Sequence, residues 1–130
     1  MSHWVKYENK TFENTNMKLL SKAMRTLGYG LDNTCKSIRN AWGKSQCDCA
    51  ITKDNKTLSL GFKKNDKNIL ELVGDFYGTG VDENTFLDKV AQQYQSERIQ
   101  NVLRDNRWEI ENVTKNKNNE IVINAYEFTF

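Results

Sequence analysis

Three short segments of alternating apolar residues, separated by polar turns, run through positions 47–73. The alternating side chains are Cys47, Cys49, Ile51, Leu58, Leu60 and Phe62, followed by the run 69–73. Alternation of this kind is typical of strands that bury one face. Turns as short as Lys53–Lys56 and Lys64–Lys67 require antiparallel neighbours, because a parallel connection needs about a dozen residues. The sequence therefore predicts a three-stranded antiparallel meander.

Two amphipathic helices flank this meander. The first carries apolar residues at helical spacing and ends at Gly28 or Gly30; these residues are Met17, Leu20, Met24 and Leu27. The second is expected from Glu83 to about Arg104, with Asp82 near its N-terminus. Its apolar stripe consists of Phe86, Leu87, Val90, Ala91, Tyr94, Val102 and Leu103. Both stripes are predicted to lie against one face of the sheet.

The remaining segments complete the predicted fold. A strand is expected at His3–Tyr7, and a closing hairpin at 108–113 and 121–130, with a polar turn at Lys115–Asn119. Residues 31–44 are polar and leave a short strand and an ordered loop as alternatives. The predicted fold is α+β, a single domain over residues 1–130, with a mainly antiparallel sheet, two helices on one face and the order β-α-β-β-β-α-β-β. The other face is expected to be partly polar or covered by a second copy.

The three cysteines do not form a recognisable metal motif. Cys47 and Cys49 are predicted to share one strand face, because side chains repeat every two residues. Together with Cys35 and His3 they supply the four ligands that a structural zinc site needs, but the spacing lacks a C-x-x-C pair. We expect buried free cysteines, no metal and no cofactor.

Composition and motifs narrow the classes of function. No G-x-S-x-G, H-E-x-x-H or P-loop string occurs, so no catalytic residues are assigned and a binding protein is favoured over an enzyme. The net charge of +2 gives no argument for nucleic acid. Positions 17–46 are basic and positions 70–90 acidic, a pattern that could steer a charged partner or drive head-to-tail self-association into a homo-oligomer; two ordinary solvated faces are the alternative. No apolar run is long enough to cross a membrane, so a cytoplasmic protein is expected.

The most distinctive string is the loop Gly74–Gly80, which precedes the second helix. Its three glycines permit the close approach of a ligand or a neighbouring chain. A helix N-terminus favours anions, but the nearby acidic residues Asp75, Asp82 and Glu83 would repel a phosphate. A purely structural turn is the alternative. The predicted contact residues in this loop are Asp75, Phe76, Tyr77 and Gly78.

Three residues within the second helix extend the predicted site: Gln93, Tyr94 and Arg98. Tyr94 fits the apolar stripe, and Arg98 lies one turn further along it, where a cation must pair with an acid or bind an anion. A second hypothesis follows from these residues. If Arg98, Arg104 and Arg107 lie near Tyr77 and Tyr94, they could hold a phosphate and stack a base, as in a small-molecule or nucleotide-signal binder such as a phage anti-defence sponge.

Several short motifs resemble one protein family. In order along the chain they are Met1-Ser2-His3, Leu27-Gly28, Phe76-Tyr77-Gly78, Asp82, Phe86-Leu87, Gln92-Gln93-Tyr94 and the turn Asn116–Glu120. This pattern resembles the family of unknown function that includes the hypothetical chloroplast reading frame 35 proteins, found in plastids, cyanobacteria, other bacteria and phages. The likeness covers most of the chain and is strongest over 70–123, whereas 31–51 departs from it.

The resemblance implies a fold and a set of gene neighbours, not a reaction. Relatives are often encoded beside ferredoxin-like proteins and AAA-type ATPases, which implies a protein partner in assembly or remodelling. It also implies the plastid stroma for a plastid-encoded member and the host cytoplasm for a phage-encoded one. The favoured hypothesis is a non-enzymatic binding or adaptor protein that makes contact through the Gly74–Gly80 loop and the start of the second helix.

Overall fold

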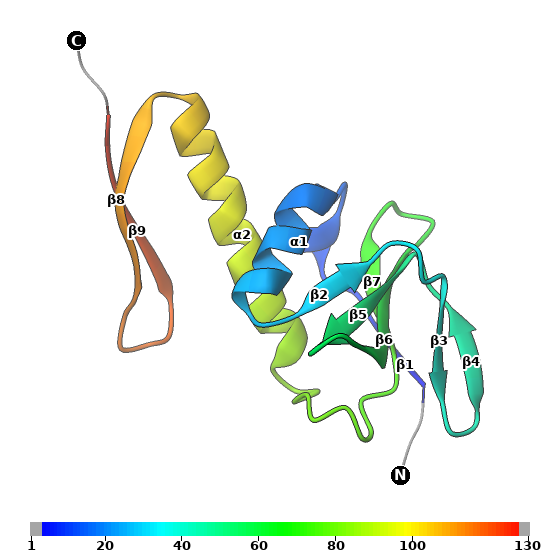
Figure 1. Cartoon of the computed structure of the whole chain (residues 1–130). Coiled ribbons are helices and arrows are strands. Elements are labelled where there is room, and N and C mark those ends of the chain that lie inside the picture. Colours follow the sequence, from blue (N-terminus) through cyan, green and yellow to red (C-terminus); the bar gives the residue numbers. More distant parts are fainter. Residues whose placement is uncertain (1–3, 128–130) are drawn as a thin grey trace.

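Five antiparallel strands form the main sheet, in the order β1-β7-β6-β5-β2. They are β1 (Val5–Tyr7), β7 (Leu70–Gly74), β6 (Lys56–Lys64), β5 (Cys49–Lys53) and β2 (Gly30–Asp32). The structure is a computed structural model that describes residues 4–127 (Figure 1). In the central strand β6, Phe62 lies opposite Cys49 on one side and Leu72 on the other. The predicted antiparallel meander is thereby confirmed.

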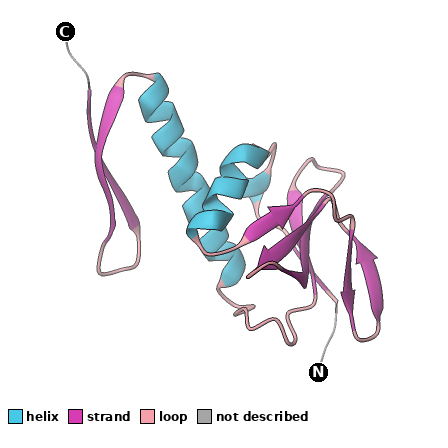
Figure 2. Cartoon of the chain, viewed as in Figure 1, coloured by secondary structure: helices cyan, strands magenta, loops and turns pink. Residues whose placement is uncertain are grey.

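Two helices and a short 3-10 helix cover one face of this sheet (Figure 2). The helices are α1 (Met17–Thr26) and α2 (Phe86–Asp105), and the 3-10 helix is η1 (Lys10–Phe12). Asn16 caps α1, since its side-chain oxygen accepts a hydrogen bond from the Leu19 amide at 3.2 Å. The core between these layers includes Phe12, Leu20, Ala23, Met24, Ile51, Leu60, Phe62, Leu72, Phe86, Val90 and Tyr94. The predicted α+β class and element order are confirmed.

The segment whose structure the sequence left open forms β2 and a hairpin, β3 (Ser37–Asn40) and β4 (Gly43–Gln46). This hairpin covers part of the sheet face opposite the helices. A second, smaller core lies beneath it and consists of Ile38, Cys47, Ala50 and Val73. The chain's own hairpin therefore covers part of the face that was expected to be partly polar or covered by a second copy, and the pair Lys63 and Glu71 lies on the same face.

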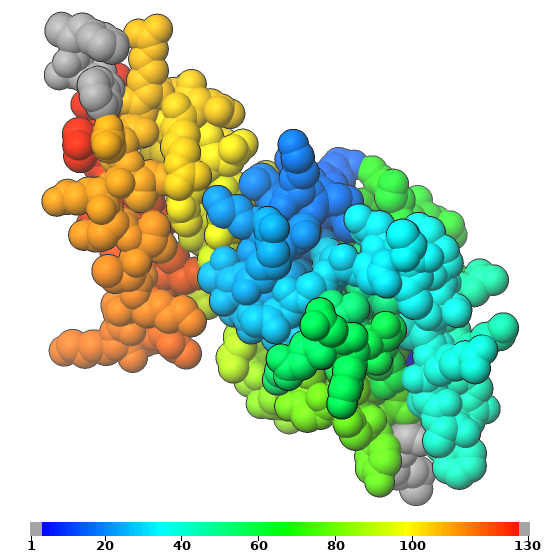
Figure 3. Space-filling view, in the orientation of Figure 1, coloured from blue at the N-terminus to red at the C-terminus, as the bar shows by residue number. Residues whose placement is uncertain are grey.

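The second half of α2 extends beyond the sheet and carries the closing hairpin, β8 (Trp108–Lys115) and β9 (Ile121–Glu127). The hairpin folds back along the helix, so that Gln92 Nε2 donates to the carbonyl of Asn119 at 3.0 Å (Figures 1 and 3). The buried core takes no residue of α2 beyond Tyr94. The prediction that the apolar stripe lies on the sheet as far as Leu103 is wrong, because Val102 is 57% exposed.

Other boundaries also differ from the prediction. The helix α2 begins at Phe86, because Asp82 first closes a turn by accepting from the Asn84 amide at 3.0 Å and the Thr85 hydroxyl at 3.1 Å. Cys47 and Cys49 do not share a face. The chain bends at Asp48, so Cys49 joins the core beneath the helices and Cys47 joins the core beneath β3–β4. The predicted strand residues His3 and 128–130 lie outside the described residues.

Candidate functional site

The loop after β7 begins with a glycine that no other residue could replace without strain. Gly74 has φ 140°, and a Cβ placed there would lie 2.1 Å from the carbonyl oxygen of Ser59. The close approach brings two hydrogen bonds: the Asp75 amide donates to the Ser59 carbonyl at 2.8 Å, and the Ser59 hydroxyl donates to the Asp75 carbonyl at 2.7 Å. The start of the loop is thus fixed to β6.

Asp75 is a framework residue of this loop and is only 2% exposed. One carboxylate oxygen accepts from Asn40 Nδ2 at 2.8 Å, and the other accepts from the Tyr77 amide at 3.0 Å. The Asn40 side-chain oxygen accepts in turn from the amides of Trp42 and Gly43, at 2.9 and 3.0 Å. Asp75 and Asn40 therefore hold the loop and the β3–β4 turn in one fixed arrangement.

Of the other predicted loop residues, Phe76 points inward and Tyr77 outward. The Phe76 ring is buried with its centroid 6.3 Å from that of Tyr7 and 6.2 Å from that of Phe86. Tyr77 is 68% exposed. Gly78 has φ 76° and open space around it, so it turns the chain at the surface. Tyr77 is accordingly the predicted loop residue best placed to touch another molecule.

Two tryptophans that the sequence analysis did not assign to the site lie on neighbouring segments. Trp42, at the tip of the β3–β4 turn, is 79% exposed, and Trp4 is exposed just before β1. Asn40 ties the Trp42 turn to Asp75, and the pairing of Val5 with Gly74 brings Trp4 to the same region. We call Trp4, Trp42 and Tyr77 the aromatic end. The signal for Trp42 is a turn that starts with Asn40 and ends with Gly43, which places the two residues between them, Ala41 and Trp42, at the tip.

The surface beside the aromatic end is acidic. A groove lined by Tyr7, Glu8, Asn9, Glu83, Asn84, Leu87 and Asp88 runs between β1 and the start of α2. The Tyr7 hydroxyl donates to the Glu83 carboxylate, and this hydrogen bond raises the pKa of Tyr7. Glu8 forms an ion pair with Lys67 at 3.1 Å. The carboxylates of Glu83 and Asp88 favour a neutral or basic partner and disfavour a phosphate.

The predicted residues within α2 lie in a different place from the loop. Tyr94 is buried, where its hydroxyl accepts from the Asn16 amide at 2.9 Å and its ring lies 5.6 Å from that of Phe12. The guanidinium of Arg98, which is exposed, lies 5.8 Å from the centre of the Tyr94 ring. Arg98 follows Phe86 by twelve residues, about 18 Å along the helix axis. The structure does not bring Arg98 together with Tyr77, as the nucleotide hypothesis required.

Gln93 belongs to a buried polar cluster between α1 and α2. Its side-chain amide donates to Glu97 Oε1 at 3.1 Å, and the other oxygen of Glu97 lies 3.3 Å from Lys22 Nζ. Both Gln93 and Glu97 are buried, whereas Lys22 reaches solvent. This cluster connects the two helices, and the side chains that form it are occupied with one another.

The three thiols differ in burial: Cys47 and Cys49 are buried, whereas Cys35 is partly exposed. Burial raises the pKa of Cys49 to about 11, and burial followed by the charges of Cys35 and Asp48 raises the pKa of Cys47. Cys35 is half-buried and donates from its sulfur to the Ser37 carbonyl at 3.1 Å. Between residues 4 and 127, no group of three or more His, Cys, Asp or Glu side chains is placed to hold a metal ion.

Comparison with known proteins gives one match. The model of a family described as "protein of unknown function (DUF1257)" matches residues 23–123, which is most of the chain. The range includes the Gly74–Gly80 loop, the whole of α2 and the β3–β4 turn. No curated protein and no solved structure is significantly similar. Within the described residues, neither helix is long and apolar enough to span a membrane.

Proposed function

We propose, from the premise that the chain belongs to the family described as protein of unknown function (DUF1257), that it is a non-enzymatic binding or adaptor protein. Its contact surface is the aromatic end, together with the start of α2. The expectation of a family without an established activity is confirmed by the match over residues 23–123. The partner we propose is a protein with a neutral or basic contact surface.

The observation that carries this proposal is the exposure of Trp42 and Tyr77 on a rigid support. Tryptophan and tyrosine contribute disproportionately to binding energy when a partner buries them. Here they are 79% and 68% exposed, yet the backbone beneath both is fixed by Asn40 and Asp75. A preorganised surface loses little conformational entropy on binding, so the aromatic rings can contribute most of their burial to affinity.

A protein partner fits this surface better than a phosphate-bearing ligand does. Asp82 and Asp88 are exposed beside the groove, and both would repel a phosphate at the start of α2. The arginines of the competing nucleotide-signal hypothesis, Arg98 and Arg104, lie in the second half of α2. A thermal-shift screen with nucleotides separates the two hypotheses, because a nucleotide binder would be stabilised by several degrees.

Affinity capture with matched variants tests the proposal. The full chain, the double variant Trp42→Ala with Tyr77→Ala, and the control Tyr126→Ala are each used as bait in lysate of the native host. Tyr126 is also an exposed aromatic residue, but it lies on β9. The proposal expects one set of proteins retained by the wild type and by Tyr126→Ala and lost with the double variant. Equal retention by all three baits would rule out the aromatic end as the contact surface.

The resemblance to the chloroplast reading frame 35 family allows the partner and the cellular location to be proposed more specifically. An AAA-type ATPase is the partner that the resemblance to the chloroplast reading frame 35 family favours, and purified ATPase from the gene neighbourhood is the first to test. We also propose relatives in plastids, cyanobacteria, other bacteria and phages. The corresponding locations are the cytoplasm, the plastid stroma or the cytoplasm of an infected host. A fluorescent fusion imaged in the native host would test the location.

A further inference from the structure

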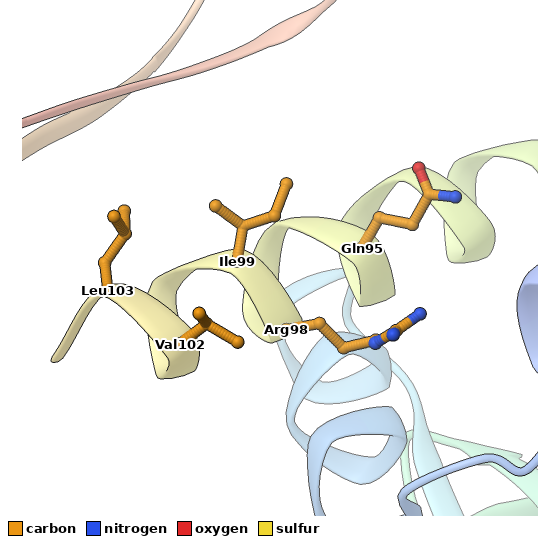
Figure 4. Close-up of a pocket in the computed structure, with 5 residues that line it drawn as sticks. All are labelled: Gln95, Arg98, Ile99, Val102 and Leu103. Atoms are coloured by element: carbon orange, nitrogen blue, oxygen red, sulfur yellow. The ribbon is translucent and has the colours of Figure 1, made fainter. Parts of the chain in front are cut away.

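The second half of α2 carries two apolar side chains that are more than half exposed to solvent. Gln95, Arg98, Ile99, Val102 and Leu103 line an open groove, and they project from one stretch of the helix (Figure 4). Ile99 is 51% exposed and Val102 57%. A helix that served only its own chain would turn this face inward.

The side of the same stretch that turns toward the chain is polar. Ser96 and Gln100 are buried, and Gln100 Nε2 donates to the Ser96 hydroxyl at 3.0 Å. Arg104 in turn donates to the Gln100 side-chain oxygen at 3.3 Å. Polar residues inward and apolar residues outward indicate that the outward face is completed by another molecule.

Two opposite charges lie at the ends of this outward face. Arg98 and Asp105 are seven residues apart, so they share a side of the helix with Val102 between them, and about 10 Å separates them along the axis. Both residues are exposed. In the described part of the chain, neither forms an ion pair. Along the helix axis the outward face is therefore positive at Arg98, apolar at Val102 and negative at Asp105.

From this pattern we propose that the outward face of α2 binds the same face of a second copy of this chain. In an antiparallel pair with a two-fold axis level with Asn101 and Val102, Arg98 of each copy lies opposite Asp105 of the other. Val102 of both copies then packs between the two ion pairs, with Ile99 at the flank of the contact. A parallel pair would place Arg98 against Arg98, so the charge pattern selects the antiparallel arrangement.

The dimer adds a property that the proposed binding function does not supply by itself. Two copies joined through α2 carry two aromatic ends, so a partner with repeated sites would be bound by both at once. A contact made by a few helical turns is small, and we expect a dissociation constant on the order of tens of micromolar. The dimer would form at high local concentration, such as on a shared partner.

Sedimentation equilibrium of the full chain tests the proposal, over about 5 to 500 µM. The wild type should dimerise in this range. Arg98→Asp and Asp105→Arg should each weaken association by about tenfold or more, because each brings like charges together. An equimolar mixture of these two variants should associate again, because each then meets the opposite charge at both positions. Lys89→Asp, on the opposite side of α2, is the control and should associate like the wild type.

Three results would overturn the proposal. They are a wild type that stays monomeric at the highest concentration, single charge variants that associate like the wild type, and a mixture that stays monomeric although its components are folded by circular dichroism. The outcome is independent of the aromatic end, since Arg98→Asp and Asp105→Arg leave Trp42 and Tyr77 unchanged. Capture of a partner by these variants is measured separately.

Discussion

The side-chain amide of Asn40 donates to the buried carboxylate of Asp75 over 2.8 Å, and it joins the β3–β4 hairpin to the loop after β7. The same amide group accepts from the backbone at Trp42 and Gly43. One side chain therefore positions a tryptophan on one segment while it stabilises the loop that carries Tyr77. Asn40 and Asp75 thus connect the fixed backbone of the two segments to the exposed aromatic side chains that the segments carry.

Asn40→Ala should lower the free energy of unfolding by about 1–3 kcal/mol, because the substitution removes a hydrogen bond to a buried carboxylate. It should also increase the motion of Trp42, whose turn loses its side-chain acceptor. Urea denaturation measures the first effect and fluorescence anisotropy of the tryptophans the second. Unchanged values for both would show that the contact contributes nothing in solution.

Gly74→Ala should be among the most destabilising single substitutions, with a loss of about 3 kcal/mol or more. The new Cβ would lie 2.1 Å from the Ser59 carbonyl oxygen, at a φ of 140° that L residues avoid. Gly78→Ala is the matched control: its φ is also positive, at 76°, but nothing surrounds it, so a loss of about 1 kcal/mol is expected. Chemical denaturation of both variants gives the comparison, and equal losses would contradict the geometry of the loop.

Tyr94→Phe should cost about 0.5–1.5 kcal/mol, because the Asn16 amide at the start of α1 loses its hydrogen bond to the phenol oxygen. The ring and its packing against Phe12 are retained. Tyr77→Phe removes the same hydroxyl from an exposed side chain and should leave stability within about 0.5 kcal/mol of the wild type. Thermal denaturation of both variants provides the test; a similar effect of the two would argue against the buried position of Tyr94.

The cysteines should differ strongly in their reaction with a thiol reagent. A pKa of about 11 leaves about one in a thousand Cys49 side chains as thiolate at pH 8, and the raised pKa of Cys47 acts in the same direction. Native protein at pH 8 should therefore react rapidly at Cys35 alone, and at all three thiols in denaturant. Mass spectrometry of alkylated peptides identifies the sites. Rapid labelling of Cys49 in native protein would show that β5 is open to solvent.

The raised pKa of Cys49 also affects how the stability of the protein depends on pH. The pKa of Cys49 is raised in the folded chain from an ordinary value of 9.0 to about 11. Protonated Cys49 therefore favours the folded state fully below pH 9, and this contribution is lost as the pH rises toward 11. Cys49→Ala should make the fall in stability between pH 9 and 11 shallower, which denaturation at several pH values would measure. An unchanged slope would mean that other groups dominate alkaline unfolding.

The strands of the meander could be predicted because alternation is a local property of the sequence. The β3–β4 hairpin could not, since its only fully buried side chain, Ile38, packs on Ala50 and Val73 from distant strands. The shared face of Cys47 and Cys49 was predicted from a strict period of two, which the bend at Asp48 breaks. In each case the failure arises where long-range packing or a single bend decides the outcome.

The residues of the candidate site could likewise be predicted where a local pattern decides and not where long-range packing decides. Periodicity identified Val102 as apolar and on one stripe with Tyr94, but burial depends on what lies opposite, and the sheet does not reach that far. Glycine density drew attention to the Gly74–Gly80 loop, yet it could not tell the inward Phe76 from the outward Tyr77. Trp4 lies near the site only because β1 pairs with β7, which no local pattern reveals.

The outermost strands of the main sheet, β1 and β2, contain three residues each. So short a border offers few unpaired backbone amides and carbonyls to a foreign strand, which discourages fibril-like stacking of one sheet onto the next. Specific assembly through the main sheet must consequently be encoded in side chains, where single substitutions can change it without disturbing the backbone.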